Sequence, residues 1–141
     1  MLKPNRQHVV VTEEKAQNDA VRKSGTKQVE SRNQKRFVVW ARQIGLEIAH
    51  LNNGASSKTR RINLAALGCQ RGAADLLIFD RLPAQPMAGG LALEFKSPEG
   101  RQSKDQKRWQ KRIERLGWVY RVVRSDDEAR GVCREMGLDP G

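Results

Sequence analysis

Cysteine, histidine and long apolar runs are all scarce in this chain of 141 residues, and each scarcity excludes a class of protein. Cys69 and Cys133 lie far apart without a C-x-x-C motif, and His8 and His50 do not complete a convincing zinc site of four ligands. Nothing in this pattern indicates an oxidising compartment. No segment approaches the roughly 20 apolar residues of a membrane span, and no signal-peptide apolar region opens the chain. We therefore expect a reduced, cytoplasmic protein without a membrane partner.

Acidic residues are the minority among the charged ones, and this imbalance suggests the kind of partner. The chain has 27 Lys and Arg against 16 Asp and Glu, which gives a net charge of +11. Such an excess favours a polyanionic partner, of which nucleic acid is the commonest. A basic protein without such a partner is the alternative at this point. Nothing in the sequence resembles a motif that reads DNA bases.

The chain divides into a polar N-terminal segment and one domain. Residues 1–29 are rich in Lys, Gln, Asn, Glu and Ser, so we expect a flexible basic segment there. Residues 30–141 have a length that suits a single domain. Helical spacing and capping residues predict helices at 30–44, 63–67, 103–116 and after Ser125. Apolar runs predict strands at 46–51, 75–79, 91–96 and 118–123. Strands that alternate with helices predict an α/β fold with a mixed central sheet flanked by helices.

Two carboxylates and one amine stand where a pair of strands would present them together. Side chains alternate across a strand, so Glu94 and Lys96 share one face while their apolar neighbours face a core. Asp75 leads the preceding apolar strand, and antiparallel pairing of the two strands would bring it close to Glu94. Paired carboxylates hold hard cations such as Mg²⁺, and a metal-bound water beside a lysine can attack a phosphodiester. The combination indicates a nuclease, although structural ion pairs are the commoner explanation of either fragment alone.

The helix expected at 103–116 separates an apolar stripe from basic faces. Gln106 lies on the stripe with Trp109, and a buried amide there needs hydrogen-bond partners. We predict that Gln106 bonds into the metal site; the alternative is a helix-cap or backbone contact. Basic residues of this helix and of the turn near 58–61 are expected to contact DNA phosphates. They are Lys104, Lys107, Arg108, Lys111, Arg112, Lys58, Arg60 and Arg61.

Residues 30–136 resemble the VRR-NUC family of the PD-(D/E)xK nuclease superfamily. The resemblance rests on an ordered series: Arg71-Gly72-Ala73-Ala74-Asp75, then Leu93-Glu94-Phe95-Lys96-Ser97-Pro98-Glu99-Gly100, then Ser103, Gln106, Trp109, Gly117 and Val122-Val123-Arg124-Ser125. Asn53-Gly54 with Arg60 or Arg61 resembles a further family segment. The family usually has proline before the motif aspartate, where this chain has Ala74. That proline ligates nothing, so we expect activity to be kept.

The resemblance implies a restriction-endonuclease-like core and an endodeoxyribonuclease that depends on Mg²⁺ or Mn²⁺. Asp75 and Glu94 would bind the metal, with the backbone carbonyl of Phe95 as the third protein ligand. Lys96 would orient or deprotonate the attacking water, or offset charge on the scissile phosphate. Glu30 matches a glutamate of the first helix that reaches a metal through water; the alternative is an acid at a helix start, favoured by the helix dipole.

The resemblance also implies branched DNA as the substrate. Stand-alone phage and bacterial members resemble junction-resolving nucleases that act as homodimers in replication and repair. Two active sites suit symmetric cutting of a four-way Holliday junction. The alternatives are a flap or nicking endonuclease, an RNA-directed nuclease, and a nucleic-acid-binding module that has lost its activity. The presence of Asp75, Glu94 and Lys96 together argues against the inactive module.

Overall fold

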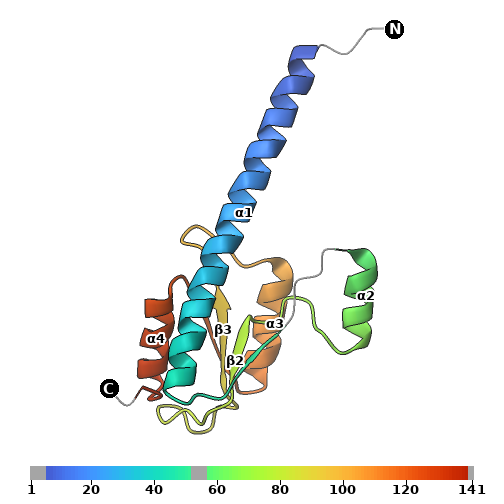
Figure 1. Cartoon of the computed structure of the whole chain (residues 1–141). Coiled ribbons are helices and arrows are strands. Elements are labelled where there is room, and N and C mark those ends of the chain that lie inside the picture. The colour runs from blue at the N-terminus through green and yellow to red at the C-terminus, as the bar shows by residue number, and fades with distance from the viewer. Residues whose placement is uncertain (1–5, 52–56, 140–141) are drawn as a thin grey trace.

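A computed structural model describes residues 6–51 and 57–139 of the chain, and the side chains of 15–19, 21–51 and 57–139. The elements are, in order, α1 (Arg6–Gln43), β1 (Ile48–His50), α2 (Lys58–Ala66), β2 (Leu76–Ile78), β3 (Leu91–Phe95), α3 (Lys104–Arg115), β4 (Val119–Val123) and α4 (Asp126–Glu135). Helices and strands alternate as predicted (Figure 1), so the α/β class is confirmed. No helix in these ranges is long and apolar enough to cross a membrane.

The four strands form one mixed sheet in the order β1-β2-β3-β4. β2 runs antiparallel to β1 and to β3, whereas β3 and β4 are parallel because α3 carries the chain back between them. Leu76 lies opposite Leu93 in the register, so Asp75, one residue before β2, comes beside Glu94 near the end of β3. The antiparallel pairing that the site required is therefore confirmed.

The two faces of β3 pack against different helices, as the alternation of its side chains predicts. On one face, Leu93 and Phe95 join a core with residues of α1 and α4 such as Phe37. On the other face, Ala92 packs with Trp109 of α3. Helices α1 and α4 thus cover one side of the sheet and α3 the other (Figure 1). Glu94 points to the α3 side, which is where its polar partners come from.

Helix α1 begins at Arg6, so the predicted helix start near residue 30 is wrong. Its first half extends away from the rest of the protein (Figure 1), and the described side chains of residues 15–25 are exposed. A helix without a packing partner has no apolar stripe, so periodicity cannot detect it, although residues with high helix propensity continue it. That residues 1–29 form a segment separate from the domain stays a prediction.

The remaining predicted elements are present, with some ends shifted. Helix α2 begins at Lys58 rather than near residue 63, because the Ser57 side chain caps it by accepting from the Arg60 backbone N–H. Ser103 and Ser125 cap α3 and α4 in the same way, as predicted. The Asn53-Gly54 part of the family resemblance lies outside the described residues.

Candidate functional site

The two predicted carboxylates meet where β2 begins and β3 ends. Asp75 Oδ2 accepts a hydrogen bond of 2.7 Å from the backbone N–H of Phe95. Glu94 is only 2% exposed, and its Oε2 atom has no hydrogen-bond partner among the described residues. A buried carboxylate oxygen without a donor is costly. Glu94 Oε2 is therefore open to a further donor or to a cation.

Burial favours the neutral form of both carboxyl groups. Desolvation, followed by the neighbouring Asp75 carboxylate, raises the pKa of Glu94 to about 8. Desolvation also raises the pKa of Asp75, together with the charge of Glu30 and against the opposing effects of the Phe95 N–H and of Lys96. A divalent cation bound here would favour the ionised form of both groups, and oxygen donors of this kind suit Mg²⁺ or Mn²⁺.

Lys96 supplies a partly buried amine on the same face as Glu94. Its Nζ atom lies 3.4 Å from Glu94 Oε1, and the Lys96 side chain is 12% exposed. The backbone N–H of Lys96 donates to the carbonyl of Val123 on β4, which fixes the residue at the end of the sheet. A Glu-x-Lys pattern on a strand is commonly a solvated ion pair at the surface. Here the two side chains are largely shielded from solvent instead.

Gln106 makes the predicted helix-cap contact and also bonds to Glu94, while its role at a metal stays a prediction. Its side-chain Oε1 atom accepts from the Ser103 backbone N–H, and its backbone N–H donates to Ser103 Oγ. These two bonds make a capping box at the start of α3. Because the amide oxygen is engaged there, the amide nitrogen faces the sheet, and Nε2 donates to Glu94 Oε1 at 2.7 Å. The first turn of α3 therefore orients the Glu94 carboxylate.

Glu30 lies close to this site, although 67 residues separate it from its hydrogen-bond partner. Its Oε1 atom accepts from the Ser97 backbone N–H at 2.9 Å, and its charge contributes to the raised pKa of Asp75 and of Glu94. The alternative of an acid at a helix start is wrong, because α1 begins 24 residues earlier, at Arg6. Within the described residues, no group of three or more His, Cys, Asp and Glu side chains is arranged to hold a metal. That Glu30 reaches a metal through water stays a prediction.

Arg124 holds the turn that follows Lys96, a role that sequence patterns missed. Its Nη1 atom donates to the carbonyls of Ser97 at 2.6 Å, Pro98 at 3.2 Å and Gly100 at 2.8 Å. Only a weak sequence signal pointed to Arg124. It stands directly before a helix-capping serine, within the Val-Val-Arg-Ser segment that resembles the family. Arg124 and Glu30 together fix the backbone on both sides of the turn.

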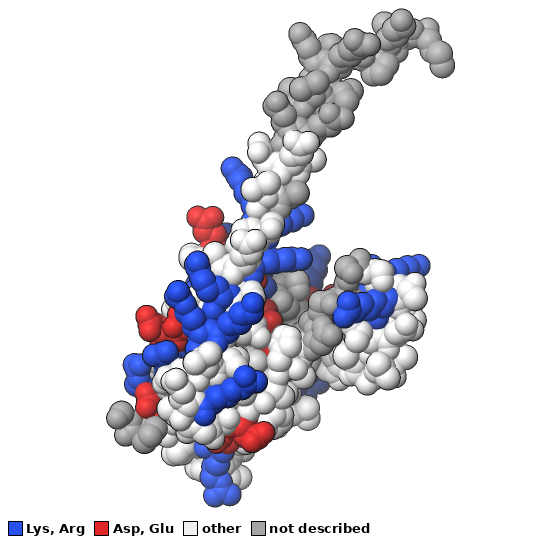
Figure 2. Space-filling model, viewed as in Figure 1, with Lys and Arg blue, Asp and Glu red and all other residues white. Residues whose placement is uncertain are grey.

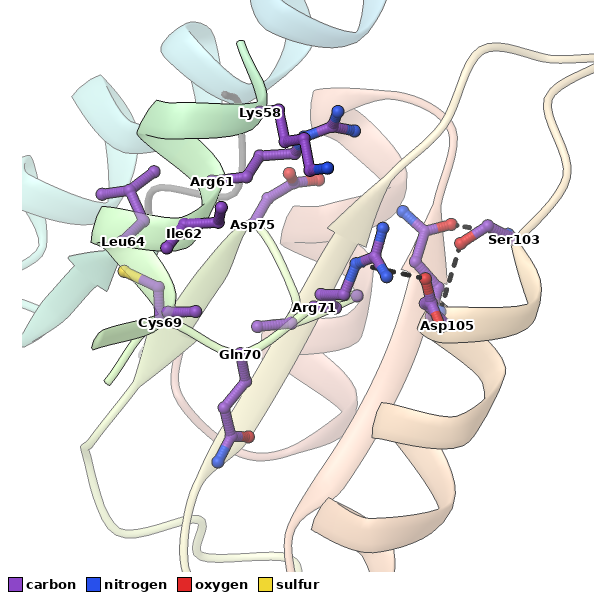
Figure 3. Close-up of a pocket in the computed structure, with 14 residues that line it drawn as sticks. Lys58, Arg61, Ile62, Leu64, Cys69, Gln70, Arg71, Asp75, Ser103 and Asp105 are labelled. Atoms are coloured by element: carbon purple, nitrogen blue, oxygen red, sulfur yellow. Dashed lines mark hydrogen bonds and ion pairs between the residues drawn. The ribbon is translucent and has the colours of Figure 1, made fainter. Parts of the chain in front are cut away.

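A pocket of about 670 Å³ opens beside Asp75 and Gln106 (Figure 3). Lys58 and Arg61 of α2 line it, whereas the neighbouring Arg60 is exposed outside it. The other predicted phosphate-binding residues are exposed on α3 and do not line the pocket: Lys104, Lys107, Arg108, Lys111 and Arg112. Their contact with DNA stays a prediction.

Further Lys and Arg side chains gather over α1 where it packs on the sheet, and over α2, on the face seen in Figure 2. Exposed basic residues of that part of α1 are Arg32, Lys35, Arg36 and Arg42. They were not among the predicted DNA contacts, since the basic outer face of an amphipathic helix is the ordinary solvated one.

A solved structure called "VRR_NUC domain protein" superposes on this chain with a TM-score of 0.61 at 19% sequence identity, covering 77% of this chain and 87% of that one. The two chains share a fold. The expected restriction-endonuclease-like core, with its mixed sheet flanked by helices, is therefore confirmed. No family model matches the sequence. Among curated proteins, none matches it either.

Proposed function

We propose that the chain is a metal-dependent endodeoxyribonuclease that hydrolyses phosphodiester bonds in branched DNA. The observation that carries the proposal is the buried Glu94 beside the half-buried Asp75 and Lys96, with no hydrogen-bond partner for Glu94 Oε2 among the described residues. The net charge of +11 supports a polyanionic substrate. The fold shared with a VRR_NUC domain protein supports a nuclease core.

Asp75 and Glu94 would hold Mg²⁺ or Mn²⁺ through carboxylate oxygens. The N–H of Phe95 points to Asp75, and the N–H and C=O of one strand residue point to the same side. The Phe95 carbonyl is thus suited to be the third protein ligand. When bound, the cation would activate a water molecule and offset charge on the phosphate.

The neighbouring side chains position the reacting groups. The Lys96 amine is placed to hold the attacking water, to assist its deprotonation, or to stabilise charge on the scissile phosphate. Gln106 holds Glu94 Oε1, which leaves Oε2 for the cation. Glu30 and Arg124 keep the turn after Lys96 in place, and Glu30 would also act on the metal through water.

The substrate that we propose is DNA at a branch point, and symmetric resolution of a Holliday junction would require a homodimer with two active sites. The basic residues Lys58 and Arg61 beside the site would hold the DNA backbone, in contacts that are independent of sequence and sensitive to salt.

Cleavage of labelled four-way junction, 5′ flap, 3′ flap, nicked and linear duplex DNA with Mg²⁺, Mn²⁺ or EDTA tests the proposal. Wild-type protein should cut in a metal-dependent way and Lys96→Ala should not, while Lys35→Ala, at an exposed position of α1, should cut normally. If no substrate is cut but tight, salt-sensitive binding remains, the chain is a DNA-binding module and the proposal is wrong.

A further inference from the structure

The pocket in Figure 3 is continuous with the carboxylate site, because Asp75 and Gln106 line both. It extends from them between α2 and the loop before β2, and Lys58 and Arg61 reach over Asp75 from α2. A substrate whose phosphate lies at the carboxylates would therefore have the next part of its chain in or over this pocket.

The pocket has a cationic side and an aliphatic side. Lys58, Arg61 and Arg71 contribute the positive charges, and the aliphatic wall comes mainly from Ile62 and Leu64. Arg71 has an acidic partner, since it lies 3.9 Å from Asp105. Within the described ranges, no carboxylate lies within 4.0 Å of the side-chain nitrogens of Lys58 or Arg61. These two charges are available to an anion.

Helix α2 does not use its aliphatic side chains for packing. None of its residues is buried, and Ile62 is 59% exposed although it lines the pocket. An apolar side chain that is exposed inside a concave site beside two cations is available to a ligand that has both an anionic group and an apolar face.

A nucleotide is the ligand class that fits both sides of the pocket. Its phosphate would meet Lys58 and Arg61, and one face of its base would lie on the wall at Ile62. An inorganic anion would leave the aliphatic wall unused. In a duplex both faces of a base are covered by its stacked neighbours, so only an unpaired nucleotide can enter such a pocket.

We propose that this pocket binds one unpaired nucleotide next to the scissile phosphate, an inference that rests on the nuclease function proposed above. The preferred substrate is then a strand that leaves its duplex beside the cut, as at a flap or an opened branch point. A fully paired duplex must first lose a base pair, which costs a few kcal/mol of unpairing and unstacking and disfavours its binding.

Two matched pairs of variants separate the pocket from general charge attraction. Arg61→Gln and Arg60→Gln remove the same charge from neighbouring exposed residues, and only Arg61 lines the pocket. Ile62→Glu and Thr59→Glu add the same charge to α2, and only Ile62 lines the pocket. All four positions are exposed, so each variant should fold, and thermal unfolding checks that it does.

Binding is measured by fluorescence anisotropy in EDTA, with one labelled strand annealed either to a full complement or to a complement that leaves a flap. Wild-type protein should bind the flap DNA about tenfold more tightly than the paired duplex. Arg61→Gln and Ile62→Glu should lose this preference. Arg60→Gln and Thr59→Glu should keep it, because a charge outside the pocket changes the affinity for both DNAs alike. The inference is overturned if the wild type binds both DNAs with equal affinity. It is also overturned if the two variants of a pair lose the preference for flap DNA to the same extent.

Cleavage of the same two DNAs with Mg²⁺ distinguishes this inference from the proposed function. Preferential cutting of the flap DNA, reduced by Arg61→Gln and not by Arg60→Gln, supports both. Cutting of both DNAs at equal rates overturns the pocket assignment alone. Pocket-dependent binding of the flap DNA without any cutting supports the pocket and overturns the nuclease function.

Discussion

Gln106 and Glu94 are joined by a hydrogen bond of 2.7 Å from Nε2 to Oε1, which links the cap of α3 to the carboxylate of β3. The same amide closes the capping box with Ser103, so one side chain contributes both to helix stability and to the geometry of the site. These two contributions can be separated by mutation.

Gln106→Ala should lower both the stability of the fold and the rate of cleavage, whereas Ser103→Ala should lower mainly the stability. Ser103→Ala removes the N-cap hydroxyl, which costs about 1 kcal/mol. Gln106→Ala keeps the bond from the backbone N–H to Ser103 Oγ and loses only the reciprocal bond of the capping box. Only Gln106→Ala also removes the partner of Glu94, and loss of a residue that supports a metal ligand typically costs about 10- to 100-fold in activity or metal affinity. Urea unfolding and single-turnover cleavage measure the two effects. If Ser103→Ala slows cleavage as much as Gln106→Ala, Gln106 acts only through the helix cap.

The stability of the metal-free protein should fall as pH rises from about 4.5 toward about 8. The folded protein holds the Glu94 proton up to a pKa of about 8, compared with an ordinary value of 4.5, so it binds more protons than the unfolded chain in that range. The contribution of the Glu94 proton to the free energy of unfolding is fully present below pH 4.5 and is lost as pH passes through 8. Mg²⁺ should restore stability at high pH, because it binds the ionised carboxylates.

Glu94→Gln provides the control for this pH dependence. The variant has no proton to lose at this position, so its stability in EDTA should depend less on pH than that of the wild type. It should also gain less from Mg²⁺. Thermal unfolding from pH 5 to 9 with EDTA or Mg²⁺ tests both points. Parallel curves for the two proteins would show that Glu94 is not the group responsible.

Arg124→Ala should slow cleavage more than it weakens DNA binding. The carbonyls of Ser97, Pro98 and Gly100 share the two N–H groups of Arg124 Nη1, and a full hydrogen bond from a charged donor contributes about 1.5–3 kcal/mol. Without them the turn after Lys96 is released, while the exposed cations that attract DNA are unchanged. Arg124→Lys, which keeps charge and three donors, should restore part of the rate.

Arg121→Ala is the matched control on β4, three residues before Arg124. Arg121 forms an ion pair of 3.6 Å with Glu135 at the surface, where the two side chains are 38% and 60% exposed, and such pairs contribute about 0–1 kcal/mol. Its loss should therefore leave cleavage close to the wild-type rate. Comparable losses of cleavage in the Arg121 and Arg124 variants would contradict a specific role for Arg124 in holding the turn.

Short-range rules account for the part of the site that could be predicted from sequence. Alternation along β3 placed Glu94 and Lys96 on one face, and the loop of prolines and glycines after β2 favoured the pairing that brings Asp75 to them. Glu30 came from the family resemblance alone, because its contact with Ser97 depends on the direction in which α1 crosses the sheet. No periodicity carries that information.

Two other features lay beyond any local pattern. The pocket exists only because α2 lies over the loop before β2, and a helix with no buried residue has no apolar stripe to indicate which side it turns to the protein. The three carbonyl contacts of Arg124 likewise depend on the parallel register of β3 and β4, which brings Phe95 opposite Val123. Both are consequences of tertiary packing.

Gly72→Ala should damage the site from the opposite side of the pocket. Gly72 has a φ of +75°, and a Cβ there would lie 2.3 Å from the backbone C and O atoms of Asp105 and 2.5 Å from the backbone N of Gln106. Such distances force the loop before Asp75 away from the first turn of α3. We expect a loss of at least about 2 kcal/mol in the free energy of unfolding, since overpacking against backbone adds to the cost of positive φ.

Gly117→Ala separates the steric clash at Gly72 from the strain of a positive φ. Gly117 has a φ of +88° at the other end of α3, but a Cβ there would meet no atom within 4 Å. Its substitution should cost only the conformational strain, about 1 kcal/mol, and should leave metal-dependent cleavage intact. Urea unfolding and cleavage of flap DNA compare the two variants. Equal stability losses, with cleavage retained in both, would mean that the loop carrying Asp75 can move without disturbing Gln106 and Glu94.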